Sequence, residues 1–329
     1  MRITLVLALA TALSAQVQPS KPADQDLPAP IKVDVDVVNI LTSVRDRRGA
    51  LVPNLEEKDF TILEDGKAQN IKYFTKETDL PLTIGLLIDV SGSQRNLIDI
   101  ERNAASQFFS QVLRKKDEAF LISFGEESEL LQDYTSSPRL LSEGLNHLQV
   151  SSGVSGIGPG PVPTASQPRG TVLYESVYLA ANDKLKSEVG RKVIVIITDG
   201  VDEGSRTTIS QAIEAAQKAD AVIYSIDYYD PGAYNNGFGI RFGGGGGEGV
   251  LKKLSDETGG RMYKVDRKHP LDQVFRELQE EMRSQYAIGY TPANDTKDGS
   301  YRKIEVKLSN KDLKAQARKG YYAIKPDAR

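Results

Sequence analysis

The stretch TIGLLIDVSGS, residues 83–93, largely decides which fold the chain is predicted to adopt. Residues 83–88 are mostly bulky and apolar, as in a strand that is buried on both faces of a parallel sheet. The run ends in Asp89, Ser91 and Ser93, which place oxygen-bearing side chains at alternate positions. A helical pattern follows, so these oxygens lie at the carboxyl end of a buried strand, where open α/β sheets place their ligand sites. Oxygen ligands alone favour Mg²⁺, Mn²⁺ or Ca²⁺ over zinc and copper.

The composition of the whole chain narrows the classes of function. With 329 residues, 39% hydrophobic and 26% charged, it is an ordinary globular sequence, long enough for about two domains. The net charge of −3 gives no general reason to expect binding to nucleic acid or to an anionic membrane. There is no Cys, so disulfides and thiolate metal sites are excluded. The only histidines, His147 and His269, make a multi-histidine zinc site unexpected.

The first residues have the pattern of an export signal. Arg2 precedes an apolar run over residues 3–13, and small residues at 12–15 offer a cleavage point. A short membrane anchor is the alternative, although the run is short for a membrane span. We expect a signal peptide over residues 1–15 and a flexible leader over residues 16–30. The mature protein is then secreted or lies in the periplasm or cell envelope, with no membrane span.

The middle of the chain, residues 80–283, alternates strands with helices. Strands are expected at residues 83–88, 119–124, 129–134, 192–197, 221–226 and 262–265, and helices at residues 97–113, 138–148, 171–185, 205–219, 248–258 and 271–283. Such alternation predicts an α/β fold with a doubly wound, mostly parallel sheet that is covered on both faces.

Two segments of β character flank this part, at residues 31–79 and 284–329. In the first, Asp65-Gly66 is a strong hairpin signal after a strand at residues 60–63, and residues 71–74 are expected to return as its partner. Each segment is too small for a core of its own. We therefore expect them to form one β-sandwich into which the α/β domain is inserted. Two separate β caps are the alternative.

Two distant places on the chain extend the oxygen cluster. Thr171 is expected to begin a helix directly after the Gly-rich stretch 151–170, and Asp199 ends the strand at residues 192–197. If the strands that carry Asp89 and Asp199 are neighbours, both carboxylates lie at one rim of the sheet. Hydroxyl ligands are neutral, so an ion held by Ser and Thr oxygens, with the Asp groups acting partly through water, stays electrophilic. It then attracts a carboxylate from a partner.

The motifs DVSGS at residues 89–93, GT at 170–171 and ITDG at 197–200 together resemble the metal-ion-dependent adhesion site (MIDAS) of von Willebrand factor type A domains. This resemblance covers residues 80–283. It implies a metal site made of the five residues Asp89, Ser91, Ser93, Thr171 and Asp199. It further implies that the two serines bind the ion directly, the threonine directly or through water, and the aspartates mainly through water. Short motifs at residues 59–60, 64–66 and 286–290 resemble those of a von Willebrand factor A-related family of bacterial exported proteins.

Each part of the pattern also has a simpler interpretation by itself. Ser93 or Thr171 could cap a helix, and Asp199 with the following Gly could form a turn. Asp202 and Glu203 could belong to a solvated loop or contribute a ligand. The Gly run 243–247 lacks the Gly-x-x-x-x-Gly-Lys-Ser/Thr pattern of a phosphate cradle, so a flexible loop is expected there.

The leading hypothesis is therefore an exported, non-enzymatic, adhesion-type protein that recognises an acidic residue of a protein partner through Mg²⁺, or through Mn²⁺ or Ca²⁺. The first alternative is a metal-dependent phosphoryl-transfer hydrolase. An aspartyl nucleophile would need an acid two residues on, where this chain has Ser91. The second alternative is a structural envelope module whose site is empty. The sequence identifies neither the partner, nor the ion, nor the oligomeric state.

Overall fold

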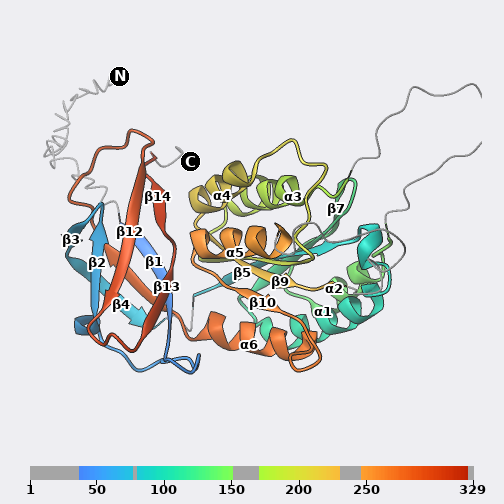
Figure 1. Cartoon of the computed structure of the whole chain (residues 1–329), viewed down its shortest axis with the longest axis horizontal. Helices are drawn as coiled ribbons and strands as arrows, with labels where there is room; N and C mark the ends of the chain where they lie inside the picture. The colour runs from blue at the N-terminus through green and yellow to red at the C-terminus, as the bar shows by residue number, and fades with distance from the viewer. Residues whose placement is uncertain (1–36, 77–79, 151–169, 230–245, 325–329) are drawn as a thin grey trace, which may run out of the picture. The chain divides into compact units, whose positions relative to one another are not determined.

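The computed structural model describes residues 37–76, 80–150, 170–229 and 246–324 (Figure 1). All of them belong to one compact unit, Asp36–Arg329. The expected signal peptide and leader, residues 1–30, lie outside the described residues. Within the described ranges, no helix combines the length and the apolar character that crossing a membrane requires.

A six-stranded sheet with the order β10-β9-β8-β5-β6-β7 forms the centre of the α/β part. Its pairs are parallel except for the edge pair of β6 and β7, which is antiparallel. Every residue of β5 and β8 is buried, because both faces of the sheet are covered. The predicted α/β fold class is thus confirmed. The strands are β5 (Leu82–Asp89), β6 (Glu118–Phe124), β7 (Ser128–Thr135), β8 (Arg191–Thr198), β9 (Ala221–Asp227) and β10 (Met262–Lys264).

Helices cover the two faces of this sheet in separate groups (Figure 1). On one face lie α1 (Ile98–Val112), α2 (Pro138–Leu145) and α6 (Leu271–Arg283); on the other lie α3 (Leu173–Leu179), which continues into the π-helical turn η3 (Ala180–Leu185), α4 (Ile209–Lys218) and α5 (Gly246–Thr258). Each group packs with one side of the sheet into its own apolar core. Leu86 and Ile88 of β5 enter the first core and Leu87 enters the second, as the alternation along a strand requires.

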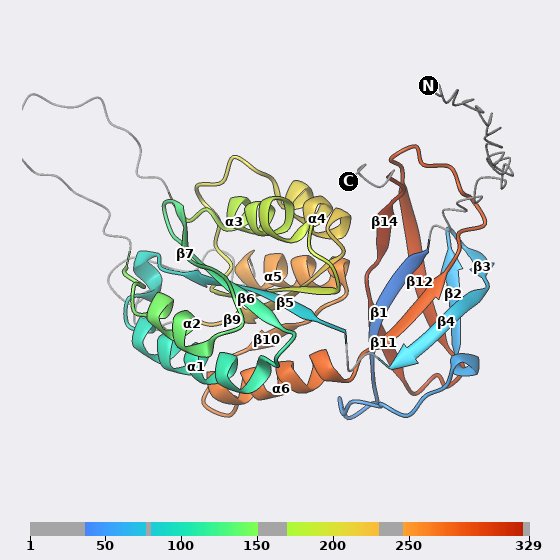
Figure 2. The same cartoon turned by 180° about the vertical axis from the view of Figure 1, so that it is seen from behind.

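Each sheet of the β part combines strands from the segment before the α/β part with strands from the segment after it. One sheet has the order β13-β1-β11-β4 and the other β14-β12-β2-β3. Figure 2 shows both sheets. Residues of both segments, among them Ile40, Ile62 and Ile288, share one core, so the segments form one sandwich and not two caps. The strands are β1 (Val38–Arg45), β2 (Phe60–Glu64), β3 (Lys67–Gln69), β4 (Ile71–Lys76), β11 (Tyr286–Tyr290), β12 (Tyr301–Leu308), β13 (Lys314–Ala317) and β14 (Gly320–Tyr322); a 3₁₀ turn, η1 (Glu57–Asp59), precedes β2.

Some local expectations were wrong. The Asp65-Gly66 turn does form a hairpin, with positive φ angles of 47° and 80°, but the partner of β2 is the short β3. The strand expected to return, now β4, pairs with β11 in the other sheet. The helices expected from residues 171 and 205 begin later, at Leu173 and Ile209.

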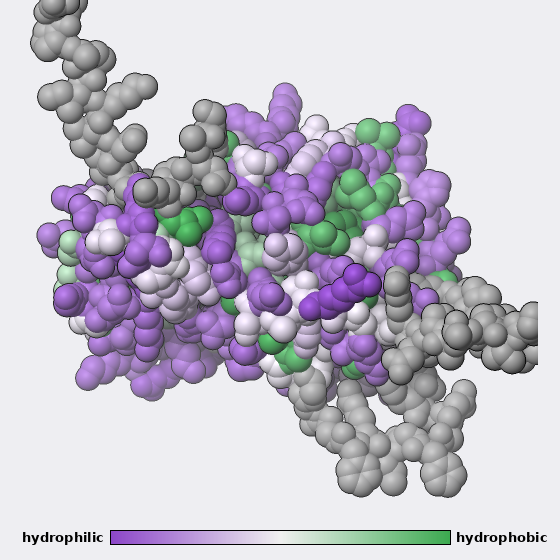
Figure 3. Space-filling model, turned by 90° about the horizontal axis from the view of Figure 1, so that it is seen from above, coloured by the Kyte–Doolittle hydropathy of each residue, from purple (hydrophilic) through white to green (hydrophobic). Residues whose placement is uncertain are grey.

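The face seen in Figure 3 is mostly hydrophilic, with small, separate hydrophobic patches. Isolated apolar residues of this kind are normal on a protein surface and carry no functional argument.

Candidate metal site at the rim of the sheet

Two neighbouring strands bring the predicted carboxylates to one edge of the sheet. Strands β5 and β8 pair in parallel, with Ile88 level with Ile197. Asp89 ends β5, and Asp199 directly follows β8, so both lie at the carboxyl ends of these strands. The side chains are almost completely buried, with exposed fractions of 0% and 5%.

Hydrogen bonds join four of the five predicted residues into one array. Asp89 accepts from the Ser91 N–H at 2.8 Å, and the hydroxyl oxygens of Ser91 and Ser93 lie 3.0 Å apart. The Ser93 hydroxyl donates to Asp199 Oδ2 at 2.9 Å. Thr198, which the sequence-based set omits, donates its hydroxyl to Asp89 Oδ2 at 2.5 Å. Its place directly before Asp199 in the ITDG motif was the only signal that could have identified it.

The fifth predicted residue, Thr171, lies in the segment that precedes α3. Its carbonyl accepts the N–H groups of Glu203 and Gly204, at 3.0 and 3.1 Å, and the next residue, Val172, donates to the carbonyl of Gly125 after β6, at 2.9 Å. The segment is therefore fixed to loops that follow β8 and β6, at the same edge of the sheet. The Thr171 hydroxyl makes no hydrogen bond with a described residue. That it binds a metal stays a prediction.

Close contacts between glycine backbones hold the loop after β8 from two sides. A Cβ atom on Gly247, at the start of α5, would lie 2.0 Å from the Asp199 carbonyl oxygen. One on Gly200, whose φ is +78°, would lie 2.5 Å from the Gly247 oxygen. On the other side, one on Gly204 would lie 2.2 Å from the carbonyl oxygen of Gly170. The loop that carries Asp199 thus fits between α5 and the Thr171 segment only because no side chain intervenes.

The electrostatics of the array favour a cation. Burial raises the pKa of Asp89 to about 6, and the charge of Asp199 acts in the same direction, whereas hydrogen bonds from Thr198 and Ser91 oppose the shift. Among the described residues, no cationic side chain shifts this pKa. A bound cation would favour the charged form of Asp89, which burial disfavours.

Two of the simpler interpretations can now be judged. Ser93 does not cap a helix, because its hydroxyl donates to Asp199, and the short 3₁₀ turn η2 (Gly92–Gln94) has no side-chain cap. Asp202 accepts from the backbone N–H of Tyr174 in the first turn of α3, at 3.1 Å, and from the Ser205 hydroxyl at 2.6 Å. Asp202 thus caps a helix.

The donor set fits a hard divalent cation. The array contains two carboxylates and the hydroxyls of Ser91 and Ser93, and the predicted set adds the hydroxyl of Thr171. All are oxygen ligands of the kind that Mg²⁺, Mn²⁺ and Ca²⁺ accept. In the described ranges, no cluster of three or more His, Asp and Glu side chains is placed to bind a metal, so hydroxyls would have to complete any metal shell here. His147 and His269 are both exposed, at the end of α2 and before α6.

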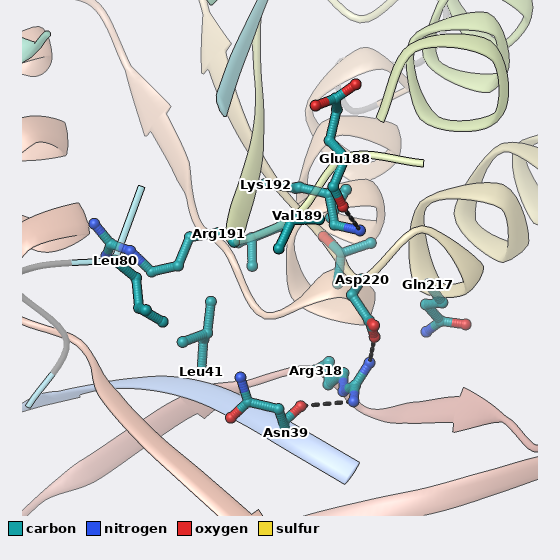
Figure 4. Close-up of a pocket in the computed structure, with 14 residues that line it drawn as sticks. Asn39, Leu41, Leu80, Glu188, Val189, Arg191, Lys192, Gln217, Asp220 and Arg318 are labelled. Atoms are coloured by element: carbon teal, nitrogen blue, oxygen red, sulfur yellow. Dashed lines mark hydrogen bonds and ion pairs between the residues drawn. The ribbon is translucent and has the colours of Figure 1, made fainter. Parts of the chain in front are cut away.

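A cavity of about 430 Å³ lies elsewhere, at the amino ends of β8 and β9 (Figure 4). Arg318, which lines it, pairs with Asp220 and donates to the Asn39 carbonyl at 2.6 Å. Lys192 donates to the carbonyl of Glu188 at 3.2 Å. Because these cationic groups already have partners in the protein, the cavity does not offer them to a ligand.

Comparison with known proteins gives distant relatives only. No protein-family profile matches the chain. A protein of Borreliella burgdorferi, described as uncharacterized, is 23% identical over 232 residues, which are 68% of this chain and 59% of that protein. The chain therefore spans less than two thirds of the length of this relative.

Solved structures that resemble the chain cover between 60% and 67% of it. The conserved hypothetical protein BatB from Bacteroides thetaiotaomicron is 17% identical, over 61% of this chain and 97% of that one, with a TM-score of 0.45. Proximal thread matrix protein 1 from the mussel byssus, with a zinc-occupied MIDAS motif, is 10% identical, over 67% and 50%, with a TM-score of 0.46. The VWA domain of SpRpn10 is 14% identical, over 60% and 95%, with a TM-score of 0.39.

Proposed function

We propose, since the α/β part of this chain is a von Willebrand factor A-like domain, that the protein is an exported, non-enzymatic binding protein. It holds a divalent cation, Mg²⁺ or else Mn²⁺ or Ca²⁺, at the rim of the sheet. Through this ion it recognises an acidic residue of a protein partner. The observation that carries the proposal is the hydrogen-bonded array of Asp89, Ser91, Ser93 and Asp199 at the ends of two adjacent parallel strands.

The chemistry of the array supports binding more than catalysis. Ser91, Ser93 and Thr171 would bind the ion through neutral hydroxyls, and the buried Asp89 and Asp199 would act mainly through water. Such a shell leaves the ion electron-poor, with a position for a carboxylate from a partner. No acid lies two residues after Asp89, where an aspartyl phosphatase would need one. Neither the hydrolase nor the empty structural module is favoured by a specific observation.

The place where the protein acts belongs to the same proposal. Residues 1–15 have the charge and apolar pattern of an export signal. Export would bring the site to the periplasm, the cell envelope or the medium, where partners with exposed acidic side chains are available.

Titration calorimetry of the metal-free chain with Mg²⁺ and with Mn²⁺ tests the site. The wild type should bind one equivalent, and Asp89→Asn, which keeps the shape of the side chain, should lose that binding. Asp99→Asn is the control, since this exposed acid in the first turn of α1 pairs only with Arg102. Equal binding by the wild type and Asp89→Asn would refute the metal site.

The partner is tested by capture from an envelope extract of the source organism. The immobilised chain should retain a protein in Mg²⁺ but not in a chelator, and Asp89→Asn should retain none. Metal-dependent hydrolysis of phosphate esters that disappears in Asp89→Asn would contradict the non-enzymatic assignment.

A further inference from the structure

A third carboxyl group, outside the set of predicted ligands, is buried in the first turn of α1, the helix that follows the turn with Ser91 and Ser93. Backbone hydrogen bonds connect the helix to that turn, from Glu101 to Leu97, from Leu97 to Gln94 and from Gln94 to Ser91. Glu101 of α1 has an exposed fraction of 0%, and neither of its carboxyl oxygens has a hydrogen-bond partner. In the described ranges it is the only carboxyl group with both oxygens in this state. A buried polar group without a partner is strongly unfavourable, so its presence calls for a physical reason.

The other fully buried acids of this chain show the contrast. Glu281 accepts hydrogen bonds from Ser43, Arg45 and Tyr263. Glu64 likewise accepts from a tyrosine and from other side chains of the sandwich. Glu281 and Glu64 are thus well bonded, and among the buried acids that the structure describes only Glu101 lacks a hydrogen bond to either oxygen.

Glu101 also interrupts an apolar stripe. It lies on the face of α1 that packs against the sheet, with Ile98, Ala105 and Phe108 on the same side. A leucine would satisfy this stripe without burying a polar group. At position 101 the helix therefore has an ionisable side chain where packing alone would favour an aliphatic one.

The charged group that acts on Glu101 is Asp89. Burial, and after it the negative charge of Asp89, raise the pKa of Glu101 well above its usual value, and among the described residues no cation shifts it. Gln94, in the turn that carries the site serines, is also fully buried. Its amide nitrogen donates to the Tyr228 carbonyl at 3.2 Å, while its side-chain oxygen has no donor. The turn η2 and the first turn of α1 thus bury two side chains, Gln94 and Glu101, whose oxygens have no hydrogen-bond partner among the described residues.

We propose that Glu101 is a positioning residue of the metal site, whose carboxyl group acts through Asp89 to strengthen the binding of a divalent cation at the rim. This inference rests on the proposed function. The cation is the positive charge that the buried pair lacks, and Coulomb attraction is strong in the weakly polar interior. The proposal gives Glu101 no place among the ligands, which are the five residues of the predicted set.

The test compares Glu101→Gln, Glu101→Leu and Glu101→Asp in the full chain, with Asp99→Asn as the control on the same helix. Glu101→Gln keeps the shape and removes the charge, and Glu101→Leu completes the apolar stripe. Both should bind Mg²⁺ about tenfold more weakly in titration calorimetry, while thermal unfolding in a chelator shows them folded. Glu101→Asp keeps the charge and should therefore recover more than half of the affinity that Glu101→Gln loses.

The charge of the probe ion separates an electrostatic role from a structural one. If Glu101 acts through its charge, the loss for Tb³⁺ should exceed that for Mg²⁺, at about thirtyfold against tenfold, because the attraction scales with ionic charge. Equal losses for both ions, or Mg²⁺ binding by Glu101→Gln within twofold of the wild type, overturn this inference alone. A wild type that binds neither ion overturns the proposed function as well.

Discussion

The contact between α5 and the Asp199 loop gives the sharpest prediction, for the substitution Gly247→Ala. The new methyl group would lie 2.0 Å from the Asp199 carbonyl oxygen, whereas real Cβ atoms essentially never come closer than 3.0 Å. Both groups belong to the backbone, so neither can swing away as the end of a flexible side chain would. The helix start or the loop must therefore move by about 1 Å, the difference between the two distances.

That movement should reach the metal site. The Ser93 hydroxyl lies 2.9 Å from Asp199 Oδ2, and a shift of about 1 Å along this direction takes the pair beyond hydrogen-bonding range. The lost bond is worth about 1 kcal/mol. Strain from the added methyl group is worth about 1–3 kcal/mol, and alanine recovers up to about 1 kcal/mol through its helix propensity. We expect the free energy of unfolding to fall by about 1–4 kcal/mol. The dissociation constant for Mg²⁺ should rise about 5- to 30-fold, which corresponds to about 1–2 kcal/mol of binding free energy.

Gly249→Ala is a matched control in the same helix, because a Cβ atom there meets nothing within 4 Å. It should bind Mg²⁺ as the wild type does and unfold at an equal or slightly higher urea concentration. The assays are urea unfolding in a chelator and titration calorimetry with Mg²⁺. If Gly247→Ala matches this control in both measurements, the close contact does not position Asp199 and the reasoning is wrong.

Three further predictions concern buried side chains. The pKa of Asp89 in the folded, metal-free protein is about 6, above its usual value of 3.8, so between these pH values the folded state holds a proton that the unfolded chain releases. Stability in a chelator should therefore increase as pH falls from 7 to 4; Asp89 contributes at most about 3 kcal/mol of this increase, and Asp89→Asn should reduce the slope in urea unfolding. Thr198→Val removes the hydroxyl that bonds Asp89 and should weaken Mg²⁺ binding about fivefold; unchanged calorimetry would show that this bond does not orient the carboxylate. Glu281→Leu leaves the partly buried Arg45 without its carboxylate and should lower the free energy of unfolding by about 3–5 kcal/mol, measured by urea unfolding. If the double mutant with Arg45→Met is as stable as the wild type, the ion pair itself is dispensable.

The fold could be predicted to a large extent because its main signals are local. The apolar run of β5 is long and uninterrupted, and helices such as α1 and α6 show one-sided apolar spacing that is visible within a short window. The sequence does not predict that β5 and β8 are neighbours, because strand order is decided by packing between distant segments. The structure supplies that order, and with it the proximity of Asp89 and Asp199.

The hairpin after β2 shows where local reasoning fails. Asp65-Gly66 identifies the turn, but the next strand, β3, has only three residues and no apolar alternation. The stronger β pattern of β4 therefore predicts that strand as the partner, although β4 pairs with β11 from the other end of the chain. Pairing across this separation has no local signal.

Glu101 was missed for a related reason. Its spacing places it on the apolar face of α1, yet an acid on such a helix is ordinarily expected at the edge of the buried stripe, with its carboxylate in water. Full burial follows only from the way in which α1 packs over β5. The residue types at the rim could thus be predicted from motifs, whereas the charge behind them required the tertiary structure.

The direction of the hydrogen bonds at the rim explains how the same oxygens can serve both a closed array and a cation. The single hydroxyl proton of Ser93 goes to Asp199, so in the contact of 3.0 Å between the two serines Ser91 must be the donor. The array is then a chain of donors that runs from Ser91 through Ser93 to Asp199. Rotation of the Ser91 hydroxyl alone releases a lone pair of Ser93, while the bond to Asp199 keeps the Ser93 oxygen in place. Because backbone contacts at Gly200 and Gly247 already fix the loop, the rim can accept an ion through a hydroxyl rotation, without rebuilding the loop that carries Asp199.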